Sequence, residues 1–220
     1  FEKCPSLQGA QTVTENGTRM YVKNNGPKVV VIYHGNAGSA CDRELIATFF
    51  ASQGYSYVLP EYAGYSNDSV LPSHNAVKRD VENVIAYLSN SDYTNAVVFG
   101  ESIGTGAASY HSSLNKPYRL ILVSPFTTLV DIARNRFWFY PASLLVDNAF
   151  DNVSLLEGMT SPTLILHGDN DTLIPQRLGF KLYGSLPDGI ATFVSIAGAG
   201  HNTTYDHPET FDSITNFLSQ

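Results

Sequence analysis

Short runs of β-branched and aromatic residues alternate with longer amphipathic stretches along most of this sequence. The run Lys28 to Tyr33 (KVVVIY) is apolar after its first position, which is typical of a strand buried on both faces of a sheet. Further strands are expected at 56–62, 96–99, 120–124, 163–166 and 192–196, with helices between them at 42–53, 76–88, 103–112, 176–184 and 208–218. Strands separated by helices predict an α/β fold, with a mainly parallel sheet flanked by helices.

Two parts of the chain depart from this alternation. Asn16-Gly17 lies between two short segments of strand character, 11–14 and 19–23, and this dipeptide strongly favours a β-hairpin. The connection from Phe126 to Gly158 is longer than one crossover helix needs, and it is rich in aromatic residues. We interpret it as an insertion at the carboxyl edge of the sheet, where open α/β folds bind ligands. A crossover lengthened only for packing is the alternative.

Length and composition limit the classes of protein to which the chain can belong. Its 220 residues suit one domain, 1–220, built around one core. The net charge of −7 offers no basic surface for phosphates, so nucleic acid is not an expected partner. No apolar run reaches the roughly 18 residues that span a bilayer, and no transmembrane segment is expected. The sequence has no His-Glu-x-x-His and no calcium-loop pattern, so neither a metal nor a cofactor is expected.

The two cysteines, Cys4 and Cys41, leave two interpretations open. They are either unrelated thiols or a disulfide that fastens the N-terminal segment to the body of the protein. A disulfide would imply an oxidising compartment, and this slightly favours an exported or periplasmic protein over a cytoplasmic one. Because the sequence begins at Phe1 rather than Met, we expect either a cleaved leader or a shortened chain.

A Gly-x-Ser-x-Gly pentapeptide, Gly100 to Gly104, marks a candidate nucleophile directly after the predicted strand 96–99. A sharp turn from strand to helix holds such a serine in a strained backbone conformation, and the flanking glycines keep Cβ atoms out of the bend. The serine oxygen then projects above the sheet edge at a helix N-terminus, where the helix dipole favours developing negative charge. Ser102 is therefore the predicted nucleophile.

A serine nucleophile needs an adjacent base, and the sequence offers six histidines. His34 and His167 each end a strand as His-Gly, where the side chain is expected to organise the loop beneath. A solvated surface position is the default expectation for three others: His74, His111 and His207. His201 differs because it follows a strand in a glycine-rich loop, AGAGHN, at the carboxyl edge of the sheet. His201 is therefore the predicted base.

The base in turn needs a carboxylate that holds the imidazole tautomer. Asp169 and Asp171 both follow the predicted strand 163–166, and periodicity alone does not choose between them. The glycine before Asp169 and the asparagine after it suggest that the chain has already turned. We expect Asp169 to accept backbone N–H bonds within the turn, and Asp171, nearer the crest of the loop, to reach His201.

Two N–H donors are also required, to stabilise a tetrahedral oxyanion. The backbone N–H of Ile103, directly after the candidate nucleophile, is one. The other is expected from Asn36 in the loop 34–38 (HGNAG), where two glycines let the backbone turn an amide inward. As structure alone, this loop is a simple strand-to-helix turn.

Together these motifs resemble the α/β-hydrolase superfamily, and in particular its short-lidded esterases, thioesterases and depalmitoylase-like serine hydrolases. HGNAG, GESIG, HGDNDTLIP and GAGHN carry the resemblance over nearly the whole chain. The resemblance implies an eight-stranded sheet, a lid at about 126–158, and an acyl-enzyme formed from a small ester or thioester substrate. It also implies the following site: Ser102, Asp171 and His201 as the triad, with Asn36 and Ile103 as backbone donors. The segment 61–66 departs from the Arg-Gly pair of many relatives, which leaves the role of that loop and the substrate open.

Aromatic residues suggest an apolar acyl pocket, with Phe126, Trp138 and Tyr65 as candidate lining residues, although aromatics also simply pack lids. Two other functions are weighed against hydrolysis. A hydrolase fold can be reused as a binding module without activity. The glycines from 100 to 106 also match the NAD(P)-binding pattern of short-chain dehydrogenases. That motif lies in mid-chain here, and the sequence has no Tyr-x-x-x-Lys pair, so an oxidoreductase is the weaker alternative.

Overall fold

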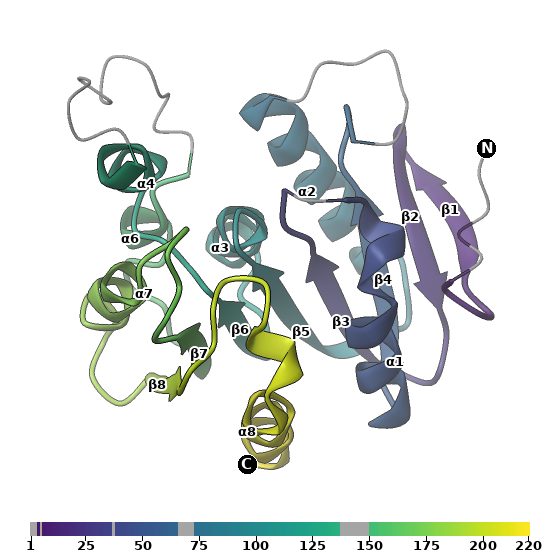
Figure 1. Ribbon diagram of the computed structural model, residues 1–220. Coiled ribbons are helices and arrows are strands. Elements are labelled where there is room, and N and C mark those ends of the chain that lie inside the picture. Colours follow the sequence, from purple (N-terminus) through teal and green to yellow (C-terminus); the bar gives the residue numbers. More distant parts are fainter. Residues whose placement is uncertain (1–3, 5, 37, 66–72, 137–149) are drawn as a thin grey trace.

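An eight-stranded sheet organises the molecule, with its strands in the order β1-β2-β4-β3-β5-β6-β7-β8 (Figure 1). The computed structural model describes residues 4, 6–36, 38–65, 73–136 and 150–220. The strands are β1 (Gln11–Glu15), β2 (Thr18–Lys23), β3 (Lys28–Tyr33), β4 (Ser56–Glu61), β5 (Thr94–Glu101), β6 (Arg119–Val123), β7 (Thr163–Gly168) and β8 (Ala191–Ile196). Pairing is antiparallel where β2 meets β1 and β4, and parallel from β4 to β8. The predicted fold class, a mainly parallel sheet flanked by helices, is confirmed.

Helices cover both faces of this sheet (Figure 1). They are η1 (Ala40–Arg43), α1 (Glu44–Ser52), α2 (His74–Ser89), α3 (Gly104–Leu114), α4 (Leu129–Arg136), α6 (Asn152–Leu155), α7 (Gln176–Tyr183), η2 (Thr204–Asp206) and α8 (Pro208–Ser219). Side chains of α1 and α8 pack into one core cluster, and those of α2, α3 and α7 pack into the other. None of the helices in the described ranges combines the length and apolar character that crossing a membrane requires.

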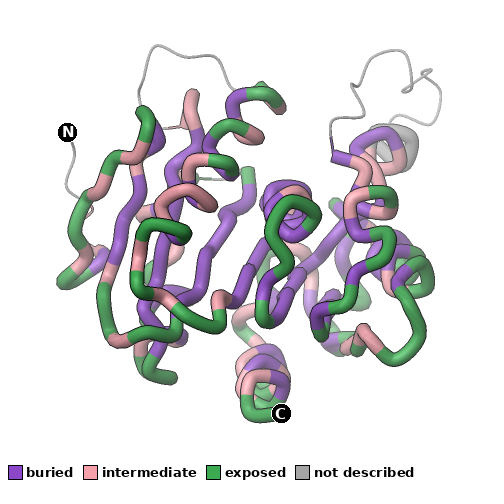
Figure 2. Tube along the Cα trace, turned by 180° about the vertical axis from the view of Figure 1, so that it is seen from behind, coloured by how far each residue is buried: buried purple, intermediate pink, exposed green. Residues whose placement is uncertain are grey.

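The apolar run of β3 is explained by these two layers. Val29, Val31 and Tyr33 belong to one core cluster, while Val30 and Ile32 belong to the other, and all five are completely buried. Successive side chains of a strand point to opposite faces, so a strand covered on both faces is apolar at every position. Burying a side chain of this size contributes about 2 kcal/mol to stability. Figure 2 shows the central strands as an almost continuously buried layer.

The predicted N-terminal hairpin is also present. Strands β1 and β2 pair from Gln11–Val22 to Glu15–Thr18, and only Asn16 and Gly17 connect them. The φ angles of these two residues are 47° and 92°. Two positive φ angles define the turn type whose twist matches that of paired strands, and Asn-Gly adopts it most readily.

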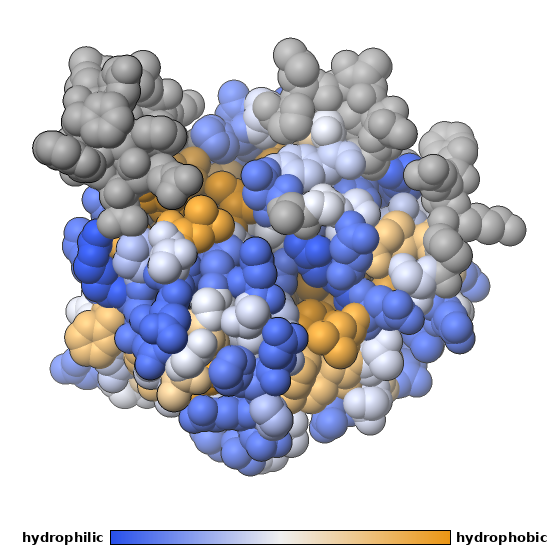
Figure 3. All heavy atoms as spheres, viewed as in Figure 1, coloured by the Kyte–Doolittle hydropathy of each residue, from blue (hydrophilic) through white to orange (hydrophobic). Residues whose placement is uncertain are grey.

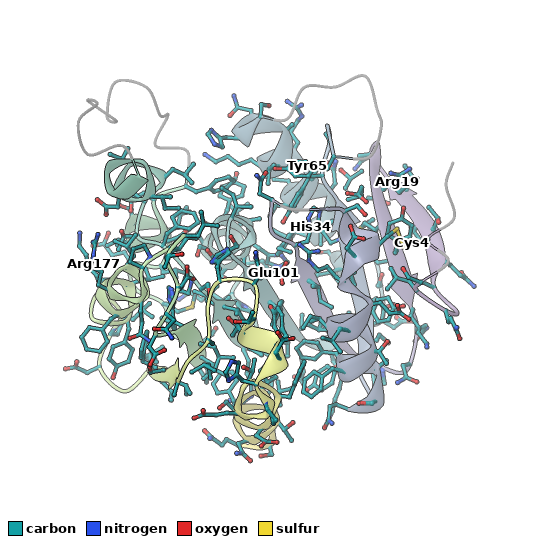
Figure 4. All side chains as sticks on the ribbon, in the orientation of Figure 1. Cys4, Arg19, His34, Tyr65, Glu101 and Arg177 are labelled. Atoms are coloured by element: carbon teal, nitrogen blue, oxygen red, sulfur yellow. A yellow bond between two sulfur atoms is a disulfide. The ribbon has the colours of Figure 1, made fainter. Side chains whose placement is uncertain are left out.

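A disulfide joins Cys4 to Cys41, which lies in η1, and the Cα atoms of the two residues are 5.5 Å apart. Both cysteines pack against the core cluster that contains Leu7, and the Ser6 hydroxyl donates a hydrogen bond to the Cys41 carbonyl at 2.8 Å. Figure 4 labels Cys4 beside the N-terminal strands. The interpretation of the two cysteines as a bond fastening the N-terminal segment is confirmed.

The long connection between β6 and β7 contains α4 and α6, and a β-bridge from Thr128 to Asp151 joins its two ends. The ring of Phe126 is completely buried in a small core cluster with Leu129 and Phe150. Trp138 belongs to the segment 137–149, which lies outside the described residues. That this insertion forms a lid stays a prediction.

His111 corrects one expectation. It lies in α3 and is 1% exposed, rather than solvated, and its Nδ1 is 2.8 Å from the hydroxyl of Tyr33. The helix is built mainly from small residues, so it packs close to the sheet and brings His111 against the side chain of a strand residue. Burial lowers the pKa of His111 to about 3.

Candidate active site

Ser102 occupies a sharp turn between β5 and α3. Its φ angle is 52°, a left-handed conformation that non-glycine residues rarely adopt. Two hydrogen bonds hold the turn: the N–H of Ser102 donates to the Val123 carbonyl at 2.9 Å, and the Thr105 hydroxyl donates to the Ser102 carbonyl at 2.6 Å. Such strain costs about 1 to 3 kcal/mol and persists only where the surrounding structure enforces it.

The two glycines of the pentapeptide are required by close backbone approaches. A Cβ atom on Gly104 would lie 2.3 Å from the carbonyl oxygen of Tyr33, at the end of β3. A Cβ atom on Gly100 would lie 2.7 Å from the Cβ of Ala108 and from the carbonyl oxygen of Gly104. Helix α3 can therefore begin directly above the sheet only if these positions carry no side chain.

Ser102, His201 and Asp171 form an unbroken chain of hydrogen-bond distances. His201 Nε2 lies 2.9 Å from Ser102 Oγ, and His201 Nδ1 lies 2.7 Å from Asp171 Oδ2. The three residues follow β5, β8 and β7, whose carboxyl ends meet at one edge of the parallel sheet. An imidazole between a hydroxyl and a carboxylate can accept the hydroxyl proton at one nitrogen while the other nitrogen keeps its own.

Asp171 is held as a carboxylate. Its residue is 6% exposed, and its Oδ1 accepts the N–H groups of Leu173 at 2.9 Å and Ile174 at 2.8 Å. Burial alone would raise the pKa of Asp171, but hydrogen bonds from His167, His201 and the Ile174 N–H outweigh it and hold this pKa well below its usual value. The side chain is therefore ionised at neutral pH and can stabilise an imidazolium.

Asp169 has different partners. It is exposed, and its Oδ1 accepts the N–H of Gly198 from the loop after β8 at 2.8 Å. We expected Asp169 to accept backbone N–H bonds within its own turn; the donor instead belongs to the neighbouring loop. This bond ties together the loops that carry Asp171 and His201.

Of the two expected oxyanion donors, Ile103 directly follows Ser102, and Asn36 lines the same cavity as Ser102. Among the hydrogen bonds between described residues, none uses the N–H of Ile103 or of Asn36. The side chain of Asn36 is exposed, and its Oδ1 accepts the hydroxyl of Tyr65 at 2.5 Å. The preceding N–H, that of Gly35, donates to Oε1 of Glu101 at 3.1 Å. The loop is thus held from both sides, and Figure 4 shows Tyr65 and Glu101 with His34 between them.

The segment 61–65, whose sequence differs from the Arg-Gly pair of many relatives, packs against this loop. The ring of Tyr62 stacks on that of His34 at 4.2 Å, and His34 Nδ1 is 2.8 Å from the Gly35 carbonyl oxygen. Glu61 is 4% exposed and accepts the N–H of Ala40 at 3.3 Å. Burial lowers the pKa of His34 to about 4. His34 is therefore neutral at physiological pH and organises the loop, as predicted for a strand-ending His-Gly.

Two cavities of about 390 Å³ each open at the turn, one beside Ser102 and the other beside Ile103. Lining residues of the first, the histidine-side cavity, include Ser102, His201, Tyr205, Asp42, Arg43 and Glu101. Those of the second, the aromatic cavity, include Tyr62, Tyr65, Val77, Ile103, Ala107 and Phe150. Both cavities have mainly apolar surfaces, and the first differs in the ionisable side chains that also line it. Leu45 and Leu173, which line the histidine-side cavity, are 57% and 50% exposed. Figure 3 shows several hydrophobic patches on the face of the molecule that is turned to the viewer in Figure 1.

The candidate pocket residues are placed differently from one another. Tyr65 lines the aromatic cavity, whereas Phe126 packs in the interior and lines neither cavity. Glu101 and Phe150 are two lining residues that the sequence analysis did not single out. Glu101 occupies a variable position of the pentapeptide, and Phe150 lies at the end of the long insertion, so neither stands in a position that a motif specifies. No three His, Cys, Asp or Glu side chains in the described ranges are grouped as metal ligands would be.

Two sequence relatives match most of this chain. An uncharacterized protein of Mycobacterium tuberculosis is 27% identical over 201 residues, which cover 89% of this chain and 71% of that protein. Lysophosphatidylserine lipase ABHD12 of Xenopus tropicalis is 28% identical over 220 residues, covering 86% of this chain but only 57% of the lipase. No family model matches the sequence.

Two solved structures show the same arrangement of strands and helices. Est1E from Butyrivibrio proteoclasticus with bound ferulic acid superposes with a TM-score of 0.78 at 18% identity, over 96% of this chain and all of that chain. MGS-MChE2, an α/β hydrolase from the metagenome of Mar Chica lagoon sediments in Morocco, has a TM-score of 0.70 at 21% identity, over 94% of this chain and 96% of that chain.

Proposed function

Because the chain has the α/β-hydrolase fold, we propose that it is a serine hydrolase that cleaves carboxylic esters or thioesters through an acyl-enzyme. The observation that carries the proposal is the continuous hydrogen-bonded chain from Ser102 through His201 to Asp171. The esterase and lipase names of its structural and sequence relatives are consistent with ester hydrolysis.

In the first half of the reaction, Ser102 Oγ attacks the carbonyl carbon of the substrate while its proton passes to His201 Nε2. The resulting imidazolium is stabilised by the Asp171 carboxylate, and the new oxyanion accepts the N–H groups of Ile103 and Asn36. When this intermediate collapses, the bond to the leaving oxygen or sulfur breaks. His201 returns the proton to the leaving group, and the acyl group stays on Ser102.

In the second half, a water molecule takes the place of the leaving group. His201 Nε2 removes a proton from the water as it attacks the acyl carbonyl carbon, and a second oxyanion forms in the same position. Collapse breaks the bond to Ser102 Oγ, which regains its proton from His201. The products are the carboxylic acid and the free enzyme.

Proton transfer determines which cavity receives which half of the substrate. The leaving group must approach His201 Nε2, and His201 lines the histidine-side cavity, so the alcohol or thiol occupies that cavity. The acyl group then extends on the opposite side, into the aromatic cavity beside Ile103. Apolar walls such as Tyr65 and Phe150 suit an alkyl or aryl acyl group, for which each buried CH₂ contributes about 0.8 kcal/mol.

Replacing the candidate nucleophile tests the proposal. We expect Ser102→Ala to lower kcat for p-nitrophenyl esters by at least about 10⁴-fold and to abolish labelling by a fluorophosphonate, because only an activated serine reacts. Ser124→Ala is the matched control, since Ser124 also follows a central strand with a positive φ angle of 49° and is 2% exposed. Activity of Ser102→Ala within threefold of the wild type would refute the proposal, and a wild-type protein that resists labelling would favour a binding module without activity.

We extend the proposal to the setting of the enzyme. The Cys4–Cys41 disulfide supports an oxidising compartment, and hence an exported or periplasmic location. Residues 1–220 form one catalytic domain, with the insertion at about 126–158 as its lid.

A further inference from the structure

Glu101, the residue before Ser102, connects three other segments through its carboxylate. Oε1 accepts hydrogen bonds from the N–H of Gly35 at 3.1 Å and from Nε of Arg43, and Oε2 accepts the hydroxyl of Tyr205 at 2.8 Å. The side chain is 12% exposed, and Figure 4 shows it near the middle of the molecule. A mostly buried carboxylate with both oxygens occupied has little freedom to move, and hydrogen bonds to a charged acceptor are the stronger ones.

The bond to Gly35 acts on the oxyanion loop, the residues directly after β3 that include the expected donor of Asn36. Gly35 and Asn36 contribute consecutive N–H groups, so a hydrogen bond to the first anchors the chain directly beside the second. The loop runs close against the turn: a Cβ on Gly35 would lie 3.3 Å from Glu101 Oε1 and 3.4 Å from Ser102 Cβ. Glu101 thus anchors the residue next to the expected donor of Asn36, close to Ser102.

The bond to Tyr205 acts on the loop that carries His201. Tyr205 lies in η2, four residues after His201. Two hydrogen bonds stiffen this stretch: the N–H of Gly200 donates to the Thr203 hydroxyl, and the Thr204 hydroxyl donates to the Gly200 carbonyl. Burial, and then the neighbouring charge of Glu101, raise the pKa of Tyr205 well above its ordinary value, so its hydroxyl remains a donor. A rigid loop held at Tyr205 keeps the imidazole of His201 in line with Ser102.

We infer that Glu101 is a positioning residue that holds the oxyanion loop and the histidine loop in register with Ser102. The inference rests on the proposed function. The carboxylate bonds to no reacting atom; it acts through the N–H of Gly35 and the hydroxyl of Tyr205. Since all its partners are donors, an amide of the same shape would supply one acceptor too few and would bring its own N–H groups against them. A displacement of about 1 Å in an active site can reduce the rate about 100-fold.

The test combines Glu101→Gln and Tyr205→Phe with a matched pair elsewhere. Glu82 and Tyr110 form the same kind of bond, 2.7 Å long, on the exposed side of α2 and α3, so Glu82→Gln and Tyr110→Phe serve as controls. Steady-state rates with p-nitrophenyl esters give kcat and KM. Inhibition by an alkyl trifluoromethyl ketone, which forms a hemiketal oxyanion with an active serine, reports on the oxyanion donors separately from substrate binding.

We expect Glu101→Gln to lower kcat and ketone affinity in parallel, each by about 100-fold, with KM changed less than about threefold. Tyr205→Phe, which removes one oxygen atom, should lower both by about 10-fold, and the control variants should stay within about twofold of the wild type. Melting temperatures show whether each variant is folded. A purely structural role would lower the melting temperature and the active fraction but leave the affinity of the remaining active sites unchanged.

The inference would be overturned if Glu101→Gln folds and keeps both kcat and ketone affinity within threefold of the wild type. It would also be overturned if kcat falls only in proportion to the fraction of active sites. If Glu101→Gln does not fold, Tyr205→Phe decides: wild-type kcat and ketone affinity in that variant would equally overturn the inference. These outcomes differ from failure of the proposed function, because in that case Ser102→Ala itself would remain active.

Discussion

At the scale of single residues, Asp169 and Asp171 illustrate how two like side chains at one strand end take different partners. Asp171 is buried and lies 2.7 Å from His201, while Asp169 is exposed and accepts the N–H of Gly198. The chain turns between them, since the N–H of Asp171 donates back to the Gly168 carbonyl at 3.4 Å. The turn directs one carboxylate toward the imidazole and the other toward the neighbouring loop.

This difference predicts opposite consequences for two conservative substitutions. We expect Asp171→Asn to lower kcat by about 10³- to 10⁴-fold, because an amide there supports the wrong imidazole tautomer. Asp169→Asn should reduce the free energy of unfolding by about 1 to 2 kcal/mol through its weakened bond to Gly198, with kcat nearly unchanged. Measuring kcat and urea unfolding for both variants checks this. An inactive Asp169→Asn beside an active Asp171→Asn would contradict the assignment.

At the scale of elements, helix α2 forms one wall of the aromatic cavity. Val77, in its first turns, and Ile85, two helical turns later, are both half-buried and pack against the core, but only Val77 lines that cavity. A larger side chain at residue 77 therefore reduces the volume of the cavity, whereas the same change at residue 85 does not.

Filling the cavity tests which half of the substrate it binds. We expect Val77→Phe to reduce kcat/KM for an octanoyl ester by about 10-fold or more, and that for an acetyl ester less than about twofold, because only the long chain needs the occupied volume. Ile85→Phe places the same change on the same helix and should affect both esters equally. If Val77→Phe also spares the octanoyl ester, the acyl chain does not lie in the aromatic cavity.

At the scale of the whole molecule, the Cys4–Cys41 disulfide closes a loop between residues 37 positions apart. In the chain-entropy model, such a crosslink stabilises a fold by about 3 to 4 kcal/mol. We expect Cys4→Ser/Cys41→Ser, and the wild type under reducing conditions, to unfold at the same lower urea concentration. Free thiols assayed in the unreduced, denatured protein provide the control, since two free thiols would exclude the bond.

Buried histidines couple stability of the fold to pH. The pKa of His34 is about 4 and that of His111 about 3 in the folded protein, compared with 6.5 for an unhindered histidine, because burial disfavours the charged imidazole. Between pH 6.5 and about 4 the unfolded chain therefore binds protons that the folded protein does not. The free energy of unfolding must fall as the pH falls through this range, by about 2 kcal/mol per histidine at pH 5.

Urea unfolding at pH 7.5, 6 and 5 measures this dependence. We expect the fall between pH 7.5 and 5 to be smaller in His111→Gln, which lacks the imidazole, than in the wild type. His207→Gln, at a half-buried position, is the control for removing a histidine as such. Stability that stays constant or rises on acidification to pH 5 would contradict the prediction.

Much of this fold could be predicted from the sequence because its signals are local. The apolar run of β3, the Asn16-Gly17 turn and the flanking glycines of Ser102 each reflect a requirement of a few consecutive residues: burial on two faces, positive φ angles, or a close backbone approach. Candidate residues at the carboxyl edge follow from the same rule, since parallel strands bring their ends together. The local pattern thus determined the sheet, the hairpin and the position of Ser102.

Other features depended on contacts between distant parts of the chain, which only the tertiary structure decides. Ser102 and His201 are 99 residues apart, and Glu101 and Tyr205 are 104 apart. The bond from Gly198 to Asp169, the burial of His111 and the contacts of Glu101 all depend on which parts of the chain the strand order places side by side. Periodicity describes which face a residue occupies, but not which distant side chain meets it there.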